Sequence, residues 1–271
     1  MDSKINTTTT KEQKQHDVRA ATYNLLTIES GMITLCVLYL IIVFRQEKPP
    51  SPPSIAAMVE KKDITSGMGK DLCVLLRNVN YMLILGIFTL IYIIYAGLGF
   101  VINPLFGGFG YSSTSISIFG ALFVLVGTIS TIIIGKYLDK SKRYLCVLRV
   151  IPFAGTCIFG IGIFVIPLGY FWITMFIVVL GGAACVPIIA VGYQFGTEVS
   201  HPTQPALVLG LMMSSAQTFL FGFNFLFLEL LNHNQNVLCL IVMSLFPLVA
   251  IFLSLFVKQD LRRLNSSMNM A

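Results

Sequence analysis

The sequence predicts an all-α membrane protein with seven transmembrane helices. Of its 271 residues, 56% are hydrophobic and only 11% are charged, and the mean hydropathy is +0.83. An ordinary soluble domain has about 25% charged residues. A helix that crosses the bilayer core needs roughly 20 apolar residues, and seven stretches are this long. They are Leu25–Phe44, Tyr81–Ile102, Ser115–Ile134, Leu145–Ile166, Phe171–Val191, Ala206–Leu228 and Val237–Val257.

The polar residues of these stretches favour membrane spans over buried soluble helices. A soluble helix would carry a polar stripe along one side, whereas Val237–Val257 has almost no polar side chain. The charged residues Glu29, Arg149 and Glu229 lie near the ends of their stretches, where a charge costs little. The first stretch is the weakest prediction, because Glu29, Ser30 and Gly31 interrupt it.

Basic residues predict which side of the membrane each connection faces. Lys and Arg gather between the first two spans, around the third connection and after the last span. An odd number of spans places these three groups on one side, and the connections at 103–114, 167–170 and 230–236 contain no Lys or Arg. The positive-inside rule makes the basic side cytoplasmic. The tail at 1–24 is then an external segment, although it is basic. We expect this exception if the natural chain has more sequence before the tail, so that the tail is an external loop.

The spacing of the spans predicts the organisation of the chain. The connection at 45–80 is long and opens with the proline-rich segment Glu47–Ser54, which cannot continue a helix. Six closely spaced spans follow within 81–257, and a cytoplasmic tail occupies 258–271. One span, a cytoplasmic linker and six further spans are typical of the second half of a twelve-helix transporter.

The sequence contains no group of residues that would make it an enzyme. The histidines, His16, His201 and His233, do not pair with Cys or Asp at the spacing of metal ligands or of a catalytic triad. No phosphate-binding loop is present, and no cofactor, metal or nucleic-acid partner is predicted. A transporter instead needs polar or aromatic groups at mid-membrane depth.

Gln217 and Tyr95 are the candidates for a substrate-binding role. Gln217 lies near the middle of its span, where an amide must bond to another helix, to water or to a substrate. Tyr95 lies deep in its span, with Tyr92 one turn before it, and an aromatic ring can hold a quaternary ammonium group. For both residues, ordinary packing between helices is the alternative.

A cluster of charges at the predicted cytoplasmic end is a candidate gate. Asp139 follows Gly135 by four residues, Arg143 lies just beyond it, and Glu198 follows the fifth span. Pairs between such groups can break and form again as a transporter changes state. Charges at the end of a span are also common without any gating role.

Five segments together resemble one family. The segments Glu47–Ser54, Gly135–Asp139, Gly192–Glu198, Ser215–Gln217 and Lys258–Arg263 occur in the order and at the helix ends found there. They resemble the feline leukaemia virus subgroup C receptor-related transporters of solute carrier family 49, within the major facilitator superfamily. The resemblance implies that the seven spans correspond to the last helix of the first half and the six-helix second half of a twelve-helix facilitator.

The resemblance also implies a cargo and a site. Members of the family carry choline and ethanolamine, and haem export has also been proposed for them. The choline site of the family combines aromatic rings with glutamines. Tyr95 and Gln217 match site positions of the seventh and eleventh family helices. Gln194 departs from the family's Glu and Met213 from a frequent Asn. The first half would have to come from a missing N-terminal portion or from a second chain.

Two other readings stay open at this point. The chain could be a truncated membrane protein that does not transport. A seven-helix receptor would have the same sides for its termini, but the sequence lacks an Asp-Arg-Tyr-like motif after the third span and Asn-Pro-x-x-Tyr in the last. Whether the protein lies in the plasma membrane or in an organelle membrane is not predicted.

Overall fold

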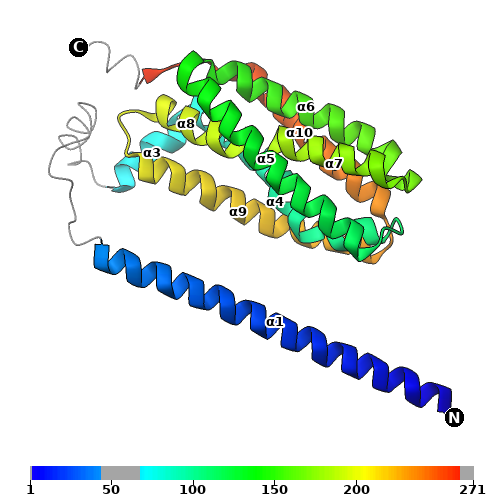
Figure 1. The fold of residues 1–271 in the computed structure, drawn as a ribbon. Helices are drawn as coiled ribbons and strands as arrows, with labels where there is room; N and C mark the ends of the chain where they lie inside the picture. The colour runs from blue at the N-terminus through cyan, green and yellow to red at the C-terminus, as the bar shows by residue number, and fades with distance from the viewer. Residues whose placement is uncertain (1, 44–67, 263–271) are drawn as a thin grey trace. The chain divides into compact units, whose positions relative to one another are not determined.

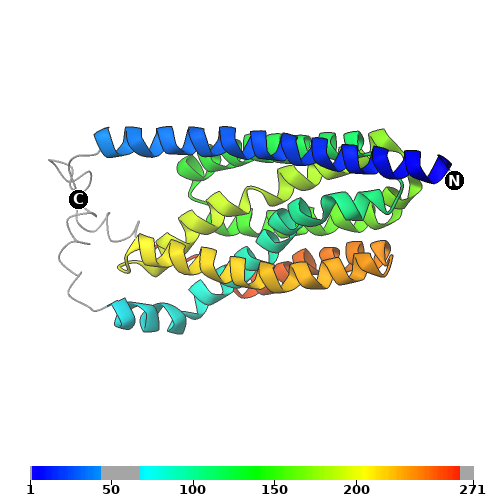
Figure 2. The same ribbon diagram turned by 90° about the horizontal axis from the view of Figure 1, so that it is seen from below.

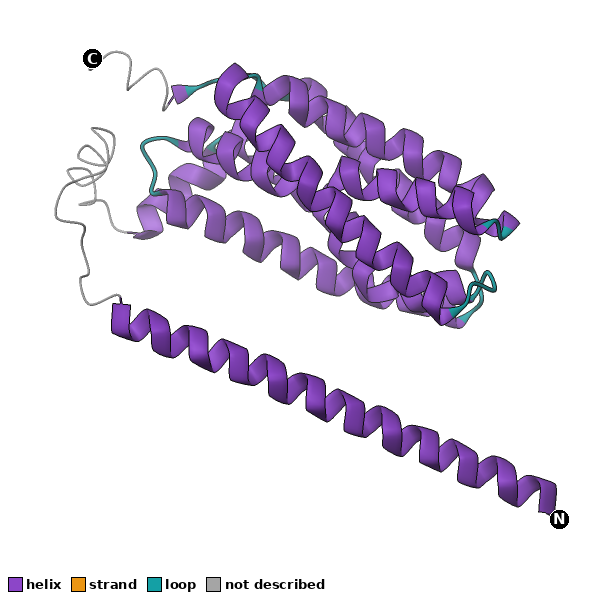
Figure 3. Ribbon diagram, viewed as in Figure 1, coloured by secondary structure: helices purple, strands orange, loops and turns teal. Residues whose placement is uncertain are grey.

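The computed structural model describes residues 2–43 and 68–262, which form helices joined by short connections, with no strand among them (Figure 3). Seven of the helical segments are long and apolar enough to cross a membrane, so the predicted all-α membrane fold is confirmed. The chain divides into two units, residues 1–54 and 55–271, each described by itself. The proline-rich segment predicted at Glu47–Ser54 lies outside the described residues.

The described residues of the first unit form one continuous helix, α1 (Asp2–Val43), whose candidate span is Thr22–Val43. The polar residues expected to weaken this span do not interrupt the helix. Thr34 Oγ1 donates a hydrogen bond to the carbonyl oxygen of Ser30 at 2.8 Å. This bond satisfies the donor of the Thr34 hydroxyl within the helix itself, so the side chain is compatible with a helix in lipid.

The second unit is a helical bundle whose long helices have roughly aligned axes (Figures 1 and 2). Its elements are α3 (Met68–Arg77), α4 (Val79–Gly107), α5 (Ser113–Ser141), α6 (Tyr144–Val165), the short 3₁₀ helix η1 (Ile166–Leu168), α7 (Phe171–Cys185), α8 (Ile188–Ser200), α9 (Pro205–Asn232) and α10 (Asn236–Phe256). The short helix α3 falls within the connection predicted as a linker. Helices α7 and α8 together make one span, Phe171–Ser200.

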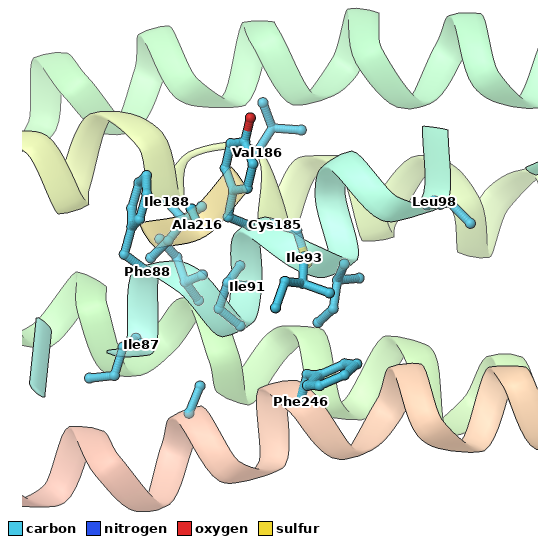
Figure 4. Close-up of a cluster of buried hydrophobic side chains, with 14 of the residues drawn as sticks. Ile87, Phe88, Ile91, Ile93, Leu98, Cys185, Val186, Ile188, Ala216 and Phe246 are labelled. Atoms are coloured by element: carbon cyan, nitrogen blue, oxygen red, sulfur yellow. The ribbon is translucent and has the colours of Figure 1, made fainter. Parts of the chain in front are cut away.

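Helix α4 lies at the centre of the bundle. In its most apolar window 67% of the residues are buried, compared with 17% in α5 and 22% in α9. It packs mainly against α8, α9 and α10, and also contacts α5. In Figure 4, Phe88 of α4 lies beside Ile188 of α8 and Ala216 of α9, and Phe246 of α10 lies on the other side of α4. Nearly every side of α4 is apolar, which suits a helix surrounded by protein.

Pro187 divides the fifth span of the chain. Proline has no backbone N–H and its ring collides with the preceding turn, so α7 ends at Cys185 and α8 begins at Ile188. Pro152 and Pro247 also lie in spans, but α6 and α10 continue through them. Of these three prolines, only Pro187 divides a span into two helices.

The segments rich in basic residues meet at one end of the bundle, which we call the basic end. Asn80 donates to the carbonyl oxygen of Lys258 at 2.7 Å and accepts from its backbone N–H at 2.9 Å. Gln259 donates to the carbonyl oxygen of Lys142 at 3.1 Å. The start of α4, the α5–α6 connection and the residues after α10 are therefore close together.

Helices α5 and α7 approach so closely that their contact requires glycine. A Cβ atom at Gly182 would collide with the backbone carbonyl oxygen of Phe123, and one at Gly127 would collide with the side chain of Val186. Small residues allow such close backbone contact in membranes, where helices gain little from hiding apolar side chains from lipid. The pair Gly127 and Gly182 thus holds α5 against α7.

We expect Gly182→Ala to destabilise the purified chain in detergent by about 1–3 kcal/mol, because the helices must separate to admit the methyl group. Gly99→Ala in α4 is the matched control, since nothing lies within 4 Å of the added carbon. That control should leave stability unchanged or raise it by about 0.5–1 kcal/mol through helix propensity. Thermal unfolding measures both, and shifts of the same sign and size would contradict the close contact.

Candidate functional site

An aromatic stripe runs along one side of α4. Phe88, Tyr92 and Tyr95 are four and three residues apart, which places them on the same face of a helix. The rings of Phe88 and Tyr92 are stacked with centroids 5.7 Å apart, and Tyr92 meets Tyr95 edge to face at 5.9 Å. Both arrangements are favourable for aromatic pairs. The stripe lies near the middle of α4, at the depth expected of a substrate site.

Neighbouring helices extend this stripe at both ends. Tyr193 of α8 stacks on Phe88 at 5.6 Å, and Phe123 of α5 stacks on Tyr95 at 6.3 Å. Phe123 is positioned by the close contact of its backbone with Gly182. Three helices thus contribute to one set of rings. We call the set the aromatic row, and its members are Tyr193, Phe88, Tyr92, Tyr95 and Phe123.

Gln217 of α9 joins the aromatic row through Tyr92. Its Nε2 atom donates a hydrogen bond of 2.9 Å to the Tyr92 hydroxyl. The side chain of Gln217 is exposed in the bundle, whereas Tyr92 is buried. An amide also carries an acceptor oxygen, so Gln217 can bond to Tyr92 and to a ligand together.

The structure therefore brings the two predicted binding residues, Tyr95 and Gln217, to the same region. Tyr95 is a member of the aromatic row and Gln217 lies beside it, and the two are linked through Tyr92, which contacts the Tyr95 ring and accepts the bond from Gln217. Tyr95 is half-buried, so its ring keeps an accessible surface that Phe88 and Tyr92 lack. The row has no charged side chain among its five members, and a cation beside it would be held by the ring faces.

Sequence reasoning missed part of this arrangement. It placed Tyr92 beside Tyr95 but did not identify it as the partner of Gln217. The spacing of 88, 92 and 95 was a signal for Phe88. No comparable signal marks Phe123 or Tyr193, because their place in the row depends on how α5 and α8 pack against α4.

The predicted charge cluster lies at the basic end. Asp139 is in the last turns of α5, Arg143 immediately precedes α6, and Glu198 is in the last turn of α8. Gln194 Nε2 lies 3.5 Å from the Asp139 carboxylate, a long hydrogen bond. Within the described ranges, Asp139 and Arg143 form no ion pair with each other. The gating role of the three charges stays a prediction.

The chain is similar to known membrane transporters. The profile of the Major Facilitator Superfamily matches residues 25–223. The choline/ethanolamine transporter flvcr2a of Danio rerio is 27% identical over 246 residues, which cover 87% of this chain and 51% of that protein. The choline/ethanolamine transporters FLVCR2 of Homo sapiens (26% identical, 87% and 45% covered) and FLVCR1 of Mus musculus (28% identical, 87% and 43% covered) are also similar. The chain spans about half the length of the curated relatives it matches.

The bond between Gln217 and Tyr92 can be measured with a double-mutant cycle. We expect Tyr92→Phe and Gln217→Leu each to lower the free energy of unfolding by about 1 kcal/mol, the usual net value of one hydrogen bond. The coupling energy should be about 0.5–1.5 kcal/mol. In the control cycle Tyr95→Phe takes the place of Tyr92→Phe. Its coupling energy with Gln217→Leu should be much smaller. Equal coupling in the two cycles would show that the amide has no preference for the Tyr92 hydroxyl.

The contact of Gln194 with Asp139 can be tested by introducing a negative charge at residue 194. Gln194→Glu places a second carboxylate near Asp139, and the repulsion should lower stability by roughly 1 kcal/mol at this partly exposed site. Adding Asp139→Asn to this variant removes the repulsion and should restore the lost stability. Thermal unfolding at neutral pH and low salt is the measurement. A double variant no more stable than Gln194→Glu alone would contradict a contact between these side chains.

Proposed function

Because the chain belongs to the Major Facilitator Superfamily, we propose that it moves a small organic cation, of the choline or ethanolamine type, across a membrane by alternating access. The aromatic row carries this proposal. Accessible aromatic rings beside an amide, at mid-depth of a multi-pass membrane protein, provide the chemistry that a quaternary ammonium group requires. The names of the similar transporters support the same class of cargo.

In this proposal Tyr95 binds the cationic group. A trimethylammonium group has no N–H donor, so the protein can attract it only through charge or through the faces of aromatic rings. A single ring contributes on the order of 0.5–2 kcal/mol, depending on how completely water is removed. The stacking of Phe123 on Tyr95 keeps the Tyr95 ring in place, so the ring does not lose its orientation when the cation binds.

Gln217 orients the other end of the cargo. Choline and ethanolamine each carry a hydroxyl group, which can donate to the amide oxygen while Nε2 remains bonded to Tyr92. With Tyr95 at the cationic group and Gln217 at the hydroxyl group, the cargo could bind in only one orientation. The cargo would also give the amide oxygen a partner in the middle of α9, where an amide without partners would be costly.

A second set of six helices would complete the site. Within the second unit, α5 and α9 have the least buried spans, and these helices contribute Phe123 and Gln217 beside Tyr95. We propose that further sequence or a second chain covers these surfaces and that the cargo binds between the halves. The six spans of 81–257 would move as one of the two bodies that rock against each other.

The basic end would face the cytoplasm. Its basic residues follow the positive-inside rule, and the hydrogen bonds of Asn80 and Gln259 bring the basic connections together. The linker at 45–80 and the tail at 258–271 would then be cytoplasmic, and the segment 1–24 external. Asp139, Arg143 and Glu198 would form the gate on the cytoplasmic side, with Gln194 donating to Asp139 where relatives of the resembled family carry Glu.

Other functions have less support. The similar proteins are transporters, which favours transport over catalysis or a receptor role. A chain that does not transport on its own is compatible with the same structure, and the uptake experiment separates this case from the first.

The uptake of labelled choline tests the proposal. Cells without their own choline uptake would express the 271-residue chain alone, or together with the first half of FLVCR2 as a separate chain. We expect uptake in at least the second case. Tyr95→Leu should raise the half-saturating concentration about tenfold, the equivalent of about 1.4 kcal/mol, while Tyr95→Phe, which keeps the ring face, should change it far less.

Gln217→Leu should reduce uptake of both choline and ethanolamine, because both carry the hydroxyl group. Tyr137→Leu is the matched control, since Tyr137 is an exposed tyrosine of α5 outside the aromatic row. Unchanged kinetics in Tyr95→Leu and Gln217→Leu would refute the site. Absence of uptake under both expression conditions, with the chain present in the membrane, would count against transport of this cargo.

A further inference from the structure

A groove between α6 and α10 opens on the outer surface of the bundle at the basic end. Its volume is about 600 Å³. Apolar side chains form most of its wall, among them Val150 and Phe153 of α6 and Ile251 and Leu255 of α10. Val150, Phe153 and Leu255 are all more than half exposed. The groove is therefore an apolar trough on the side of a membrane-spanning bundle.

Two guanidinium groups, those of Arg143 and Arg149, also line this trough. Arg143 immediately precedes α6, and Arg149 lies six residues further along the chain. At 1.5 Å per residue the two Cα atoms differ by about 9 Å in depth. This distance corresponds to the headgroup layer and the first part of the hydrocarbon core. In a membrane crossed by these spans, the charged part of the trough would therefore lie near the level of the lipid phosphates.

Arg149 is held in place by the end of α10. Its Nε atom donates to the carbonyl oxygen of Ser254 at 3.2 Å, one of the last carbonyl groups of that helix. An arginine has five N–H donors in a planar fork, so the terminal amino groups remain to bind an anion. In the described ranges the ion pairs are His233–Glu229 and Arg262–Asp260, and neither includes Arg143 or Arg149.

A charged arginine inside the end of a membrane span is costly unless it reaches an anion or water. Arginine binds phosphate through two parallel hydrogen bonds, and such bonds are strong because both groups are charged. Basic pockets between transmembrane helices are suited to anionic lipid headgroups. The trough also has an apolar wall that continues from the guanidinium groups along the span. A lipid acyl chain could bind to this wall, whereas a small free anion could not.

We propose that this groove binds one anionic phospholipid, with its phosphate between Arg143 and Arg149 and one acyl chain along Val150, Phe153 and Ile251. The proposal does not depend on the cargo of the transporter, because the groove lies between α6 and α10 and contains no member of the aromatic row. The bound lipid would fill the groove between α6 and α10 and stabilise their packing at the basic end.

The test uses the purified 271-residue chain in detergent. Phosphatidylserine, phosphatidylcholine, glycerol phosphate or inorganic phosphate is added, and native mass spectrometry and thermal unfolding report binding. We expect one phosphatidylserine per chain, a higher unfolding temperature, and at least fivefold weaker binding of phosphatidylcholine. Glycerol phosphate and inorganic phosphate should neither bind nor stabilise. A phosphate ion that stabilises as well as phosphatidylserine would overturn the lipid assignment.

Substitutions separate the groove from general attraction to a basic surface. Arg143→Gln and Arg149→Gln should each weaken phosphatidylserine binding about five- to tenfold. Arg149→Gln also loses the bond to Ser254, so Arg143→Gln is the variant whose folding is not in question. Lys140→Gln removes a charge from the same end of the bundle, but outside the groove, and should retain binding. Equal weakening by Lys140→Gln would refute the site.

The apolar wall has its own variant. Val150→Trp fills the trough and should weaken the binding of phosphatidylserine while leaving both arginines in place. Unchanged binding in this variant would contradict the placement of the acyl chain. If a second copy of the chain occupies the groove instead of lipid, native mass spectrometry would show a dimer that Val150→Trp dissociates, and the proposal would be wrong.

Discussion

The packing of α4 inside the bundle is the constraint on which the other features depend. In a membrane, an apolar helix gains little by leaving lipid for protein, so the contacts must come from close fit and from hydrogen bonds between helices. Helix α4 meets this condition with rings and branched side chains against α8, α9 and α10, and with the bond from Tyr81 to the carbonyl oxygen of Val208 at 2.9 Å. The aromatic row exists because one side of this packed helix is aromatic.

The sequence was sufficient for the spans and insufficient for their contacts. Bilayer thickness sets the length of an apolar helix, so seven spans could be predicted from local composition. The different effects of Pro152, Pro187 and Pro247 could not, since all three lie in similar apolar surroundings along the chain. Tyr95 and Gln217 could be selected as candidates because polar and aromatic groups at mid-depth are uncommon. Their meeting through Tyr92 depends on the relative depth and rotation of α4 and α9, which no local pattern records.

The two chemical features of the bundle lie in different settings. The aromatic row is neutral and near mid-depth, where a cation can be attracted without a fixed counter-charge. The groove between α6 and α10 is apolar with two cationic groups at the basic end, where anions gather. The site proposed for a cation and the site proposed for an anionic lipid thus lie on different helices of one bundle, the first around α4 and the second between α6 and α10.

The double hydrogen bond between Asn80 and Lys258 has a further consequence. It joins the first turn of α4, the first helix of the six-span set, to Lys258, which follows the last span. The six-span set therefore begins and ends at neighbouring points of the bundle. An engineer could open the chain at a different connection and join the old ends through a short bridge. The order of the helices along the chain would change while their arrangement in the membrane stayed the same.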